Sequence, residues 1–175
     1  MRRAFYLAAV CAAMSIPAAA QSKAITKQAE RGRELFLKSP KGIACGTCHT
    51  MAGVGTAVGP DLKVLASVVP PRGMVSAIQM TMAERVQEIK TSSGNFPGLL
   101  KQKQADEVEI WDLGQNPPVL KKLAAKDIVS MTRAEKWKHP PTTAEYTSQE
   151  LADIIGFLKW ASVGQTKEVK VDDVE

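Results

Sequence analysis

Histidine, cysteine and aromatic residues are scarce in this chain. It has two histidines and three cysteines among 175 residues, so few side chains are available for metal or redox chemistry. Aromatic residues make up only 5% of the sequence. A core of this size with so few aromatic rings has room for a group that is not protein. No apolar run reaches the roughly 18 residues that a membrane-spanning helix needs. The composition, 45% hydrophobic and 23% charged, predicts one compact domain and excludes a disordered or collagen-like chain.

The first twenty residues are typical of a secretory signal peptide. Two arginines follow the initial methionine, an apolar stretch covers residues 4–16, and the Pro-Ala-Ala-Ala sequence that ends at Ala20 suits a signal peptidase. We expect cleavage near Ala20, so that the mature chain begins near Gln21 and is exported to the periplasm. Cys11 would then be removed. A lipoprotein anchor at Cys11 is the alternative, but Val10 stands where such sites prefer a small residue.

Charge is dispersed along the mature chain. The sequence has 23 basic and 18 acidic residues, and removal of the leader takes away two arginines, so the net charge of the mature chain is about +3. This charge is too small and too scattered for a nucleic-acid-binding surface. We therefore expect protein partners and no nucleic acid.

The sequence Cys-Gly-Thr-Cys-His occupies residues 45–49. A disulfide between Cys45 and Cys48 is one interpretation, but such dithiols normally follow a β-strand, and no strand pattern precedes Cys45. A structural zinc site is a second interpretation. It would need His139, which lies 90 residues beyond His49, and this spacing is unlike that of a zinc finger. A c-type haem attachment site accounts for all the residues together.

Under this third interpretation, the two thiols form thioether bonds to the two vinyl groups of one porphyrin, because they lie three residues apart on one short turn. The imidazole of His49, one residue further, binds the iron. Covalent attachment takes place outside the cytoplasm, which agrees with an exported chain. We therefore expect one covalently bound haem c, with Cys45, Cys48 and His49 as binding residues.

Amphipathic helices flank this motif at both ends of the chain. From Thr26 to Lys38 the apolar residues recur at helical spacing, and the Ser-Pro-Lys-Gly sequence at 39–42 ends the helix. Near the other end, Thr147 and Glu150 form a capping box ahead of an apolar stripe. Residues 70–73 open a segment that indicates one further short helix.

With these elements in this order, the mature chain resembles a class I, monohaem cytochrome c. The matching features are the N-terminal helix with Gly32 and Phe36, the motif at 45–49, the Gly59-Pro60-Asp61-Leu62 segment, and the C-terminal helix with Gly156-Phe157-Leu158. In that family the two terminal helices cross closely, which calls for a small residue such as Gly32 against a ring such as Phe157.

The resemblance also implies roles for the segment from Gly59 to Leu62, which we expect to belong to the haem-binding site. The carbonyl of Pro60 accepts a hydrogen bond from the proximal imidazole, His49, and so fixes the orientation of the ring. Leu62 packs on the face of the haem.

The middle of the chain departs from a minimal cytochrome c. Apolar residues alternate between residues 85 and 130, and turn sequences lie at 92–95 and 112–118. We expect a small antiparallel hairpin or a three-to-four-stranded sheet here, similar to the insertions in the cytochrome domains of quinoprotein and sugar dehydrogenases. The predicted fold is mainly α, a cytochrome domain at 21–163 with this β insertion and a charged, flexible tail at 164–175.

The second axial ligand of the iron differs from that of the family. Most class I cytochromes supply a methionine from a Met-Pro pair before the C-terminal helix, and here His139-Pro140 stands in that place. Met131 is the closest alternative because it precedes the same helix, and an open or water-ligated iron is the third. We expect His49 and His139 to ligate the iron, which lowers the reduction potential relative to a His/Met pair.

The resemblance implies an electron-transfer protein rather than an enzyme. We expect a periplasmic carrier without catalytic residues, which passes single electrons from a dehydrogenase or quinol-oxidising complex to a downstream acceptor. A haem-based sensor or peroxidase-like enzyme is one alternative, and a structural cytochrome subunit of a larger redox complex is another. Lys41 and Lys63 flank the haem segments, either as a rim that steers an acidic partner or as ordinary solvated side chains.

Overall fold

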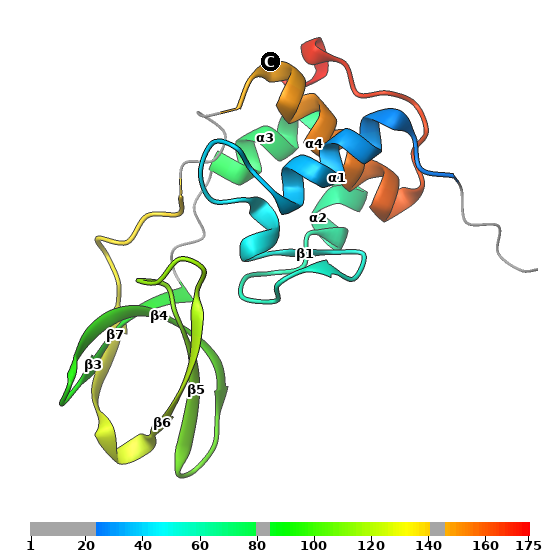
Figure 1. Cartoon of the computed structure of the whole chain (residues 1–175). Coiled ribbons are helices and arrows are strands. Elements are labelled where there is room, and N and C mark those ends of the chain that lie inside the picture. Colours follow the sequence, from blue (N-terminus) through cyan, green and yellow to red (C-terminus); the bar gives the residue numbers. More distant parts are fainter. Residues whose placement is uncertain (1–23, 80–84, 141–145) are drawn as a thin grey trace, which may run out of the picture.

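Helices and a β-sheet occupy different parts of the structure, a computed structural model that describes residues 24–79, 85–140 and 146–175. α-Helices from both ends of the described chain pack together, and the middle of the chain forms a curved sheet to one side of them (Figure 1). Over these residues the fold is mixed α/β, with four α-helices and seven strands.

The helical unit, residues 24–79 and 146–175, contains the Cys-Gly-Thr-Cys-His sequence. Its α-helices are α1 (Lys27–Leu37), α2 (Lys63–Val68), α3 (Pro71–Gln79) and α4 (Ser148–Val163). Its shorter elements are the 3-10 turns η1 (Cys45–Thr47) and η5 (Val171–Asp173) and the two-residue strands β1 (Thr50–Met51) and β2 (Val54–Gly55). The sequence predictions of both terminal helices and of one short helix after residue 70 are confirmed, whereas α2 is an addition to them.

The helices α1 and α4 cross closely at Gly32. A Cβ atom at this position would overlap the backbone carbonyl of Asp153 and lie 2.9 Å from the Cβ of Phe157, so the approach of the two backbones requires glycine. One turn further along α1, the Phe36 ring packs on the Phe157 ring with centroids 5.5 Å apart. Arg31 donates two hydrogen bonds, of 2.8 and 2.9 Å, to the buried carboxylate of Asp153. The expected close contact of the terminal helices is therefore present.

The helix α4 begins with the capping box that the sequence predicts. The Glu150 backbone N–H donates to the Thr147 hydroxyl at 3.2 Å, and the Thr147 N–H donates to the Glu150 carboxylate at 2.7 Å. The same carboxylate pairs with Lys41 at 2.7 Å, which links α4 to the loop that follows α1. The contact with Lys41, followed by that with the Thr147 N–H, lowers the pKa of Glu150 to about 2.

The C-terminal segment packs on the helical unit. Val169 and Val174 are only 3% and 6% exposed and belong to the same apolar cluster as Phe157. The buried Gln28 side chain pairs with the backbone of Val169, donating to its carbonyl at 2.7 Å and accepting from its N–H at 2.9 Å. The expectation of a charged, flexible tail at 164–175 is corrected here, because two apolar anchors among the charged residues hold the segment against the core.

Five antiparallel strands form the sheet unit, residues 86–133. The strands are β3 (Val86–Thr91), β4 (Gly94–Lys103), β5 (Glu107–Asp112), β6 (Val119–Ala124) and β7 (Ile128–Arg133). Their order in the sheet is β6-β5-β4-β3-β7, and the 3-10 turn η3 (Ala125–Asp127) joins the two edge strands. The unit has an apolar cluster of its own around Ile89, Val108 and Ile110.

The mainly α fold that the sequence predicts is wrong. The expected hairpin or three-to-four-stranded sheet at 85–130 is a five-stranded sheet, in which β7 continues to Arg133 and pairs with β3. Alternating apolar residues mark each strand locally, but they do not reveal that the first strand of the sheet pairs with the last one. Because the sheet also has a separate apolar cluster, it is a structural unit and not a minor insertion.

We expect Gly32→Ala to lower the free energy of unfolding by about 3 kcal/mol, because the added methyl group forces α1 and α4 apart. Helix propensity alone predicts the opposite sign, since alanine stabilises a helix interior by about 1 kcal/mol relative to glycine. Urea denaturation at neutral pH measures the difference. Arg33→Ala, at the next and exposed position of α1, is the matched control and should change stability by less than about 0.5 kcal/mol. An unchanged stability of Gly32→Ala would contradict the close crossing.

We also expect the stabilising contribution of the Glu150 carboxylate to be fully present above its ordinary pKa of 4.5 and to be lost as the pH falls toward its folded-state pKa of about 2. In this window the unfolded chain binds a proton that the folded chain does not. The difference in free energy of unfolding between wild type and Glu150→Gln should therefore shrink with acid, as urea denaturation over this pH range measures. Glu34→Gln, on the exposed face of α1, is the control. A difference that does not change with pH would contradict the prediction.

Candidate functional site

The two cysteines and His49 lie on one tight turn that follows α1. The backbone N–H groups of Cys48 and His49 both donate to the carbonyl of Cys45, at 3.2 and 2.9 Å, and so close the turn. The turn is held against α1 at Gly46, where a Cβ atom would lie 2.9 Å from the carbonyl oxygen of Phe36. The helix crossing therefore fixes the place of the turn, and the turn brings both thiols and the imidazole into one short loop.

Both thiols in this turn are free and half-buried. Burial raises the pKa of Cys45 to about 11 and also raises the pKa of Cys48. The folded protein therefore holds them as neutral thiols at neutral pH. The structure contains no disulfide between them, so it gives no support to the disulfide interpretation of the sequence.

The imidazole of His49 is held by the segment that follows the β1–β2 hairpin. Its Nδ1 lies 2.8 Å from the carbonyl oxygen of Pro60, and because a carbonyl only accepts, Nδ1 carries the proton and Nε2 keeps its lone pair. A Cβ at Gly59 would lie 2.8 Å from Cε1 of the same ring, so glycine is needed beside it. Burial lowers the pKa of His49, the Pro60 carbonyl acts in the opposite direction, and His139 lowers it further. The expected hydrogen bond to Pro60 is present, and the ring is kept neutral.

The segment around Pro60 is fixed by bonds on both sides. The N–H of Gly59 donates to the carbonyl of Cys48 at 2.6 Å, and the N–H of Leu62 donates to the carbonyl of Thr50 at 2.9 Å. The Thr50 hydroxyl also donates to Asp61 at 2.6 Å, and this bond is the main cause of the lowered pKa of Asp61. No individual role for Asp61 is predicted from the sequence, although an aspartate that precedes a helix is a common signal for such bonds.

His139, the other histidine of the chain, lies against His49. The ring centroids are 6.0 Å apart and the ring planes are tilted by 36°. The Nδ1 of His139 lies 3.0 Å from the carbonyl oxygen of Pro140, a contact that favours the Nδ1–H tautomer of the neutral ring, with the lone pair at Nε2. Two histidines that are far apart in the sequence are thus brought together, each with its Nδ1 next to a backbone carbonyl oxygen.

This spacing fits a metal held between two imidazoles. An imidazole nitrogen lies about 1 Å from its ring centre and binds a metal at about 2 Å, so two imidazoles on opposite sides of one ion have centroids roughly 6 Å apart. Within the described residues, no group of three or more His, Cys, Asp or Glu side chains is arranged to hold a bare metal ion. A haem iron needs only axial ligands from the protein, because the porphyrin supplies the others. The residues present therefore fit a haem that His49 and His139 would hold.

The other expected residues lie in different surroundings. Leu62 is half-buried against the helical core. Met131 lies in β7, pairs with Ile89 and packs into the cluster of the sheet unit, so its sulfur contributes to that core. Lys41 forms the ion pair with Glu150.

The remaining methionines of the mature chain offer no better partner for His49 among the described residues. Met51 and Met74 are fully buried in the helical core. Met80 and Met82 lie outside the described residues, as does the predicted leader at 1–20.

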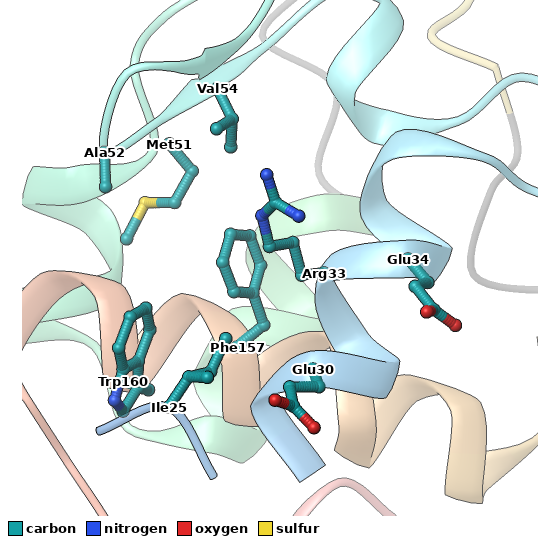
Figure 2. Close-up of a pocket in the computed structure, with 9 residues that line it drawn as sticks. All are labelled: Ile25, Glu30, Arg33, Glu34, Met51, Ala52, Val54, Phe157 and Trp160. Carbon is teal, nitrogen blue, oxygen red and sulfur yellow. The ribbon is translucent and has the colours of Figure 1, made fainter. Parts of the chain in front are cut away.

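A surface hollow of about 620 Å³ lies elsewhere on the helical unit, between α1, α4 and the β1–β2 hairpin (Figure 2). Met51, Phe157 and Trp160 give it apolar walls, and Arg33 and Glu34 belong to its lining from α1. None of the seven candidate haem-binding residues lines it, so the hollow is distinct from the site of the two histidines.

Comparison with protein-family models and with curated proteins found no match to this chain. Among the helices of the described residues, none has the length and apolar character needed to cross a membrane. The function must therefore be inferred from the residues of the site.

Proposed function

We propose that this protein is a periplasmic c-type cytochrome with one covalently bound haem, and that it transfers single electrons between redox partner proteins. The observation that supports the proposal best is the pair of facing imidazoles, His49 and His139, at 6.0 Å. The resemblance to class I monohaem cytochromes supports the proposal, and the Cys-Gly-Thr-Cys-His turn offers an attachment point next to one of the imidazoles.

In this proposal each residue of the turn and of the Pro60 segment has one role in holding the haem. Cys45 and Cys48 hold the porphyrin through two thioether bonds, and His49 binds the iron from the same turn. Pro60 orients His49, because an imidazole that donates its Nδ1–H to a carbonyl is fixed in rotation and is a stronger ligand at Nε2. Gly59 leaves space for the ring, and the half-buried Leu62 offers an apolar contact to the haem face.

His139 would supply the second ligand to the iron. A bound haem takes up and releases one electron at its iron. Were both imidazoles to ligate the iron, no coordination position would remain for a substrate, and this favours electron transfer over substrate chemistry. Two imidazoles also give a lower reduction potential than a histidine and a methionine.

The partners that suit such a carrier are a dehydrogenase or quinol-oxidising complex as donor and a downstream redox protein as acceptor. Lys63 is exposed at the start of α2, directly after the Pro60 segment, where it can meet an acidic partner. Lys41 is less suited, because its charge is already paired with Glu150 at 2.7 Å.

We expect the mature protein, produced in an exporting host that has a haem-ligation system, to have the mass of the polypeptide from about residue 21 plus one haem. The colour should stay with the protein after extraction with acidified acetone, because thioether bonds survive it. The double variant Cys45→Ala/Cys48→Ala should lose all covalent haem, and Cys11→Ala, in the predicted leader, is the matched control that should not. A mature mass without haem would contradict the proposed function.

We further expect the spectrum of a low-spin haem with two imidazole ligands, without the long-wavelength sulfur-to-iron band of methionine ligation. His139→Ala should become high-spin and bind carbon monoxide readily when reduced. Met131→Leu, which keeps the volume of the sheet core, should leave the spectrum unchanged. A sulfur-to-iron band in the wild type would remove His139 from the ligand set, and rapid carbon monoxide binding by the wild type would favour a sensor or peroxidase-like enzyme.

A further inference from the structure

The segment that ends in His139 is anchored to the sheet unit. β7 ends at Arg133, and the next residue, Ala134, donates its N–H to the carbonyl of Val86 at 3.0 Å, which extends the pairing of β7 with β3 by one bond. Ala134 is only 6% exposed. The chain therefore leaves the sheet from a buried and hydrogen-bonded position five residues before His139.

Between this anchor and His139, one aromatic ring makes contact with the imidazole. The backbone N–H of Trp137 donates to the carbonyl of Ala134 at 3.1 Å, so the chain turns directly after the anchor. The half-buried Trp137 ring meets the His139 ring edge to face, with centroids 6.3 Å apart and planes at 84°. This is a favourable arrangement of two rings, and it restricts the rotation of the imidazole.

We propose that the sheet unit is the scaffold that presents the distal ligand, and that Trp137 is the positioning residue for His139. This inference rests on the proposed function and extends it, because it gives the sheet unit a task at the haem site. His49 is held by the helical unit through the turn and Pro60, whereas His139 is held by the sheet unit through Ala134 and Trp137.

The physical reason for such a scaffold is the cost of ordering a ligand on a free chain. A histidine in a long loop must lose much conformational freedom to reach one position, and a rigid element next to it reduces this loss. Here the hydrogen bonds of Ala134 and Trp137 fix the backbone, and the Trp137 ring restricts the rotation of the His139 side chain. The Pro140 carbonyl oxygen lies 3.0 Å from Nδ1 of His139 and favours a proton on that nitrogen.

The test uses the full haem-loaded protein and compares Trp137→Leu with Trp137→Phe. Leucine keeps apolar bulk without a ring edge, so it should raise the high-spin fraction and the rate of carbon monoxide binding by roughly two- to tenfold. Phenylalanine keeps the edge contact and should restore values close to those of the wild type. Trp111→Leu, which removes a tryptophan of β5 from the same sheet, is the matched control and should leave the ligation unchanged.

A second pair of variants tests the backbone anchor. Ala134→Pro removes the N–H that bonds to Val86, whereas Ala134→Gly keeps it. We expect only the proline variant to show the high-spin signal and a changed reduction potential. Circular dichroism shows whether the sheet of each variant is still folded.

Two results distinguish failure of this inference from failure of the proposed function. If His139→Ala becomes high-spin while Trp137→Leu and Ala134→Pro, both folded, keep the spectrum of the wild type, the scaffold inference is overturned and the ligand assignment stands. If His139→Ala itself keeps the spectrum of the wild type, the two-imidazole ligation of the proposed function fails, and the scaffold inference fails with it.

Discussion

The crossing of α1 and α4 at Gly32 is the constraint on which the helical unit depends. It places Phe36 against Phe157, and the end of α1 then holds the cysteine turn through the close approach of Gly46 to Phe36. The orientation of His49 follows from this turn, since the Pro60 segment is bonded to its residues. A side chain at Gly32 would therefore disturb the imidazole through three successive contacts, although it touches none of the atoms of the ring.

Each unit of the structure is stabilised by an apolar cluster of its own. The helical unit is held by a shared apolar cluster that extends from α1 to Val174, whereas the sheet unit has a smaller cluster of its own. The contact between the His49 and His139 rings joins a residue of the first to a residue anchored on the second. Under the proposed function, a metal–ligand bond would connect the two units at this contact.

Elements that depend on neighbouring residues could be predicted from the sequence, whereas pairings between distant residues could not. The capping box at Thr147, the limits of α1 and the turn at residues 45–49 each depend on a few neighbouring residues, and the sequence predicts them correctly. The pairing of β7 with β3 and the burial of Val169 by Gln28 depend on residues far apart in the chain, so no local pattern indicated them. Helix α2 is six residues long, too short to show a helical period. The approach of His139 to His49 was expected from the family resemblance alone, and only the structure gives its distance.

The pairing of Gln28 with Val169 bears on the order of events while the chain folds. The cysteine turn lies ahead of α4 and the C-terminal segment in the chain, and these later residues complete the apolar cluster that Cys45 packs against. Until those residues arrive, the Cys45 thiol has no core to be buried in and keeps the acidity of an ordinary cysteine, so its reactive thiolate is more abundant than in the finished protein. Docking of the C-terminal segment thus ends the period in which the thiols of this turn are open to covalent modification.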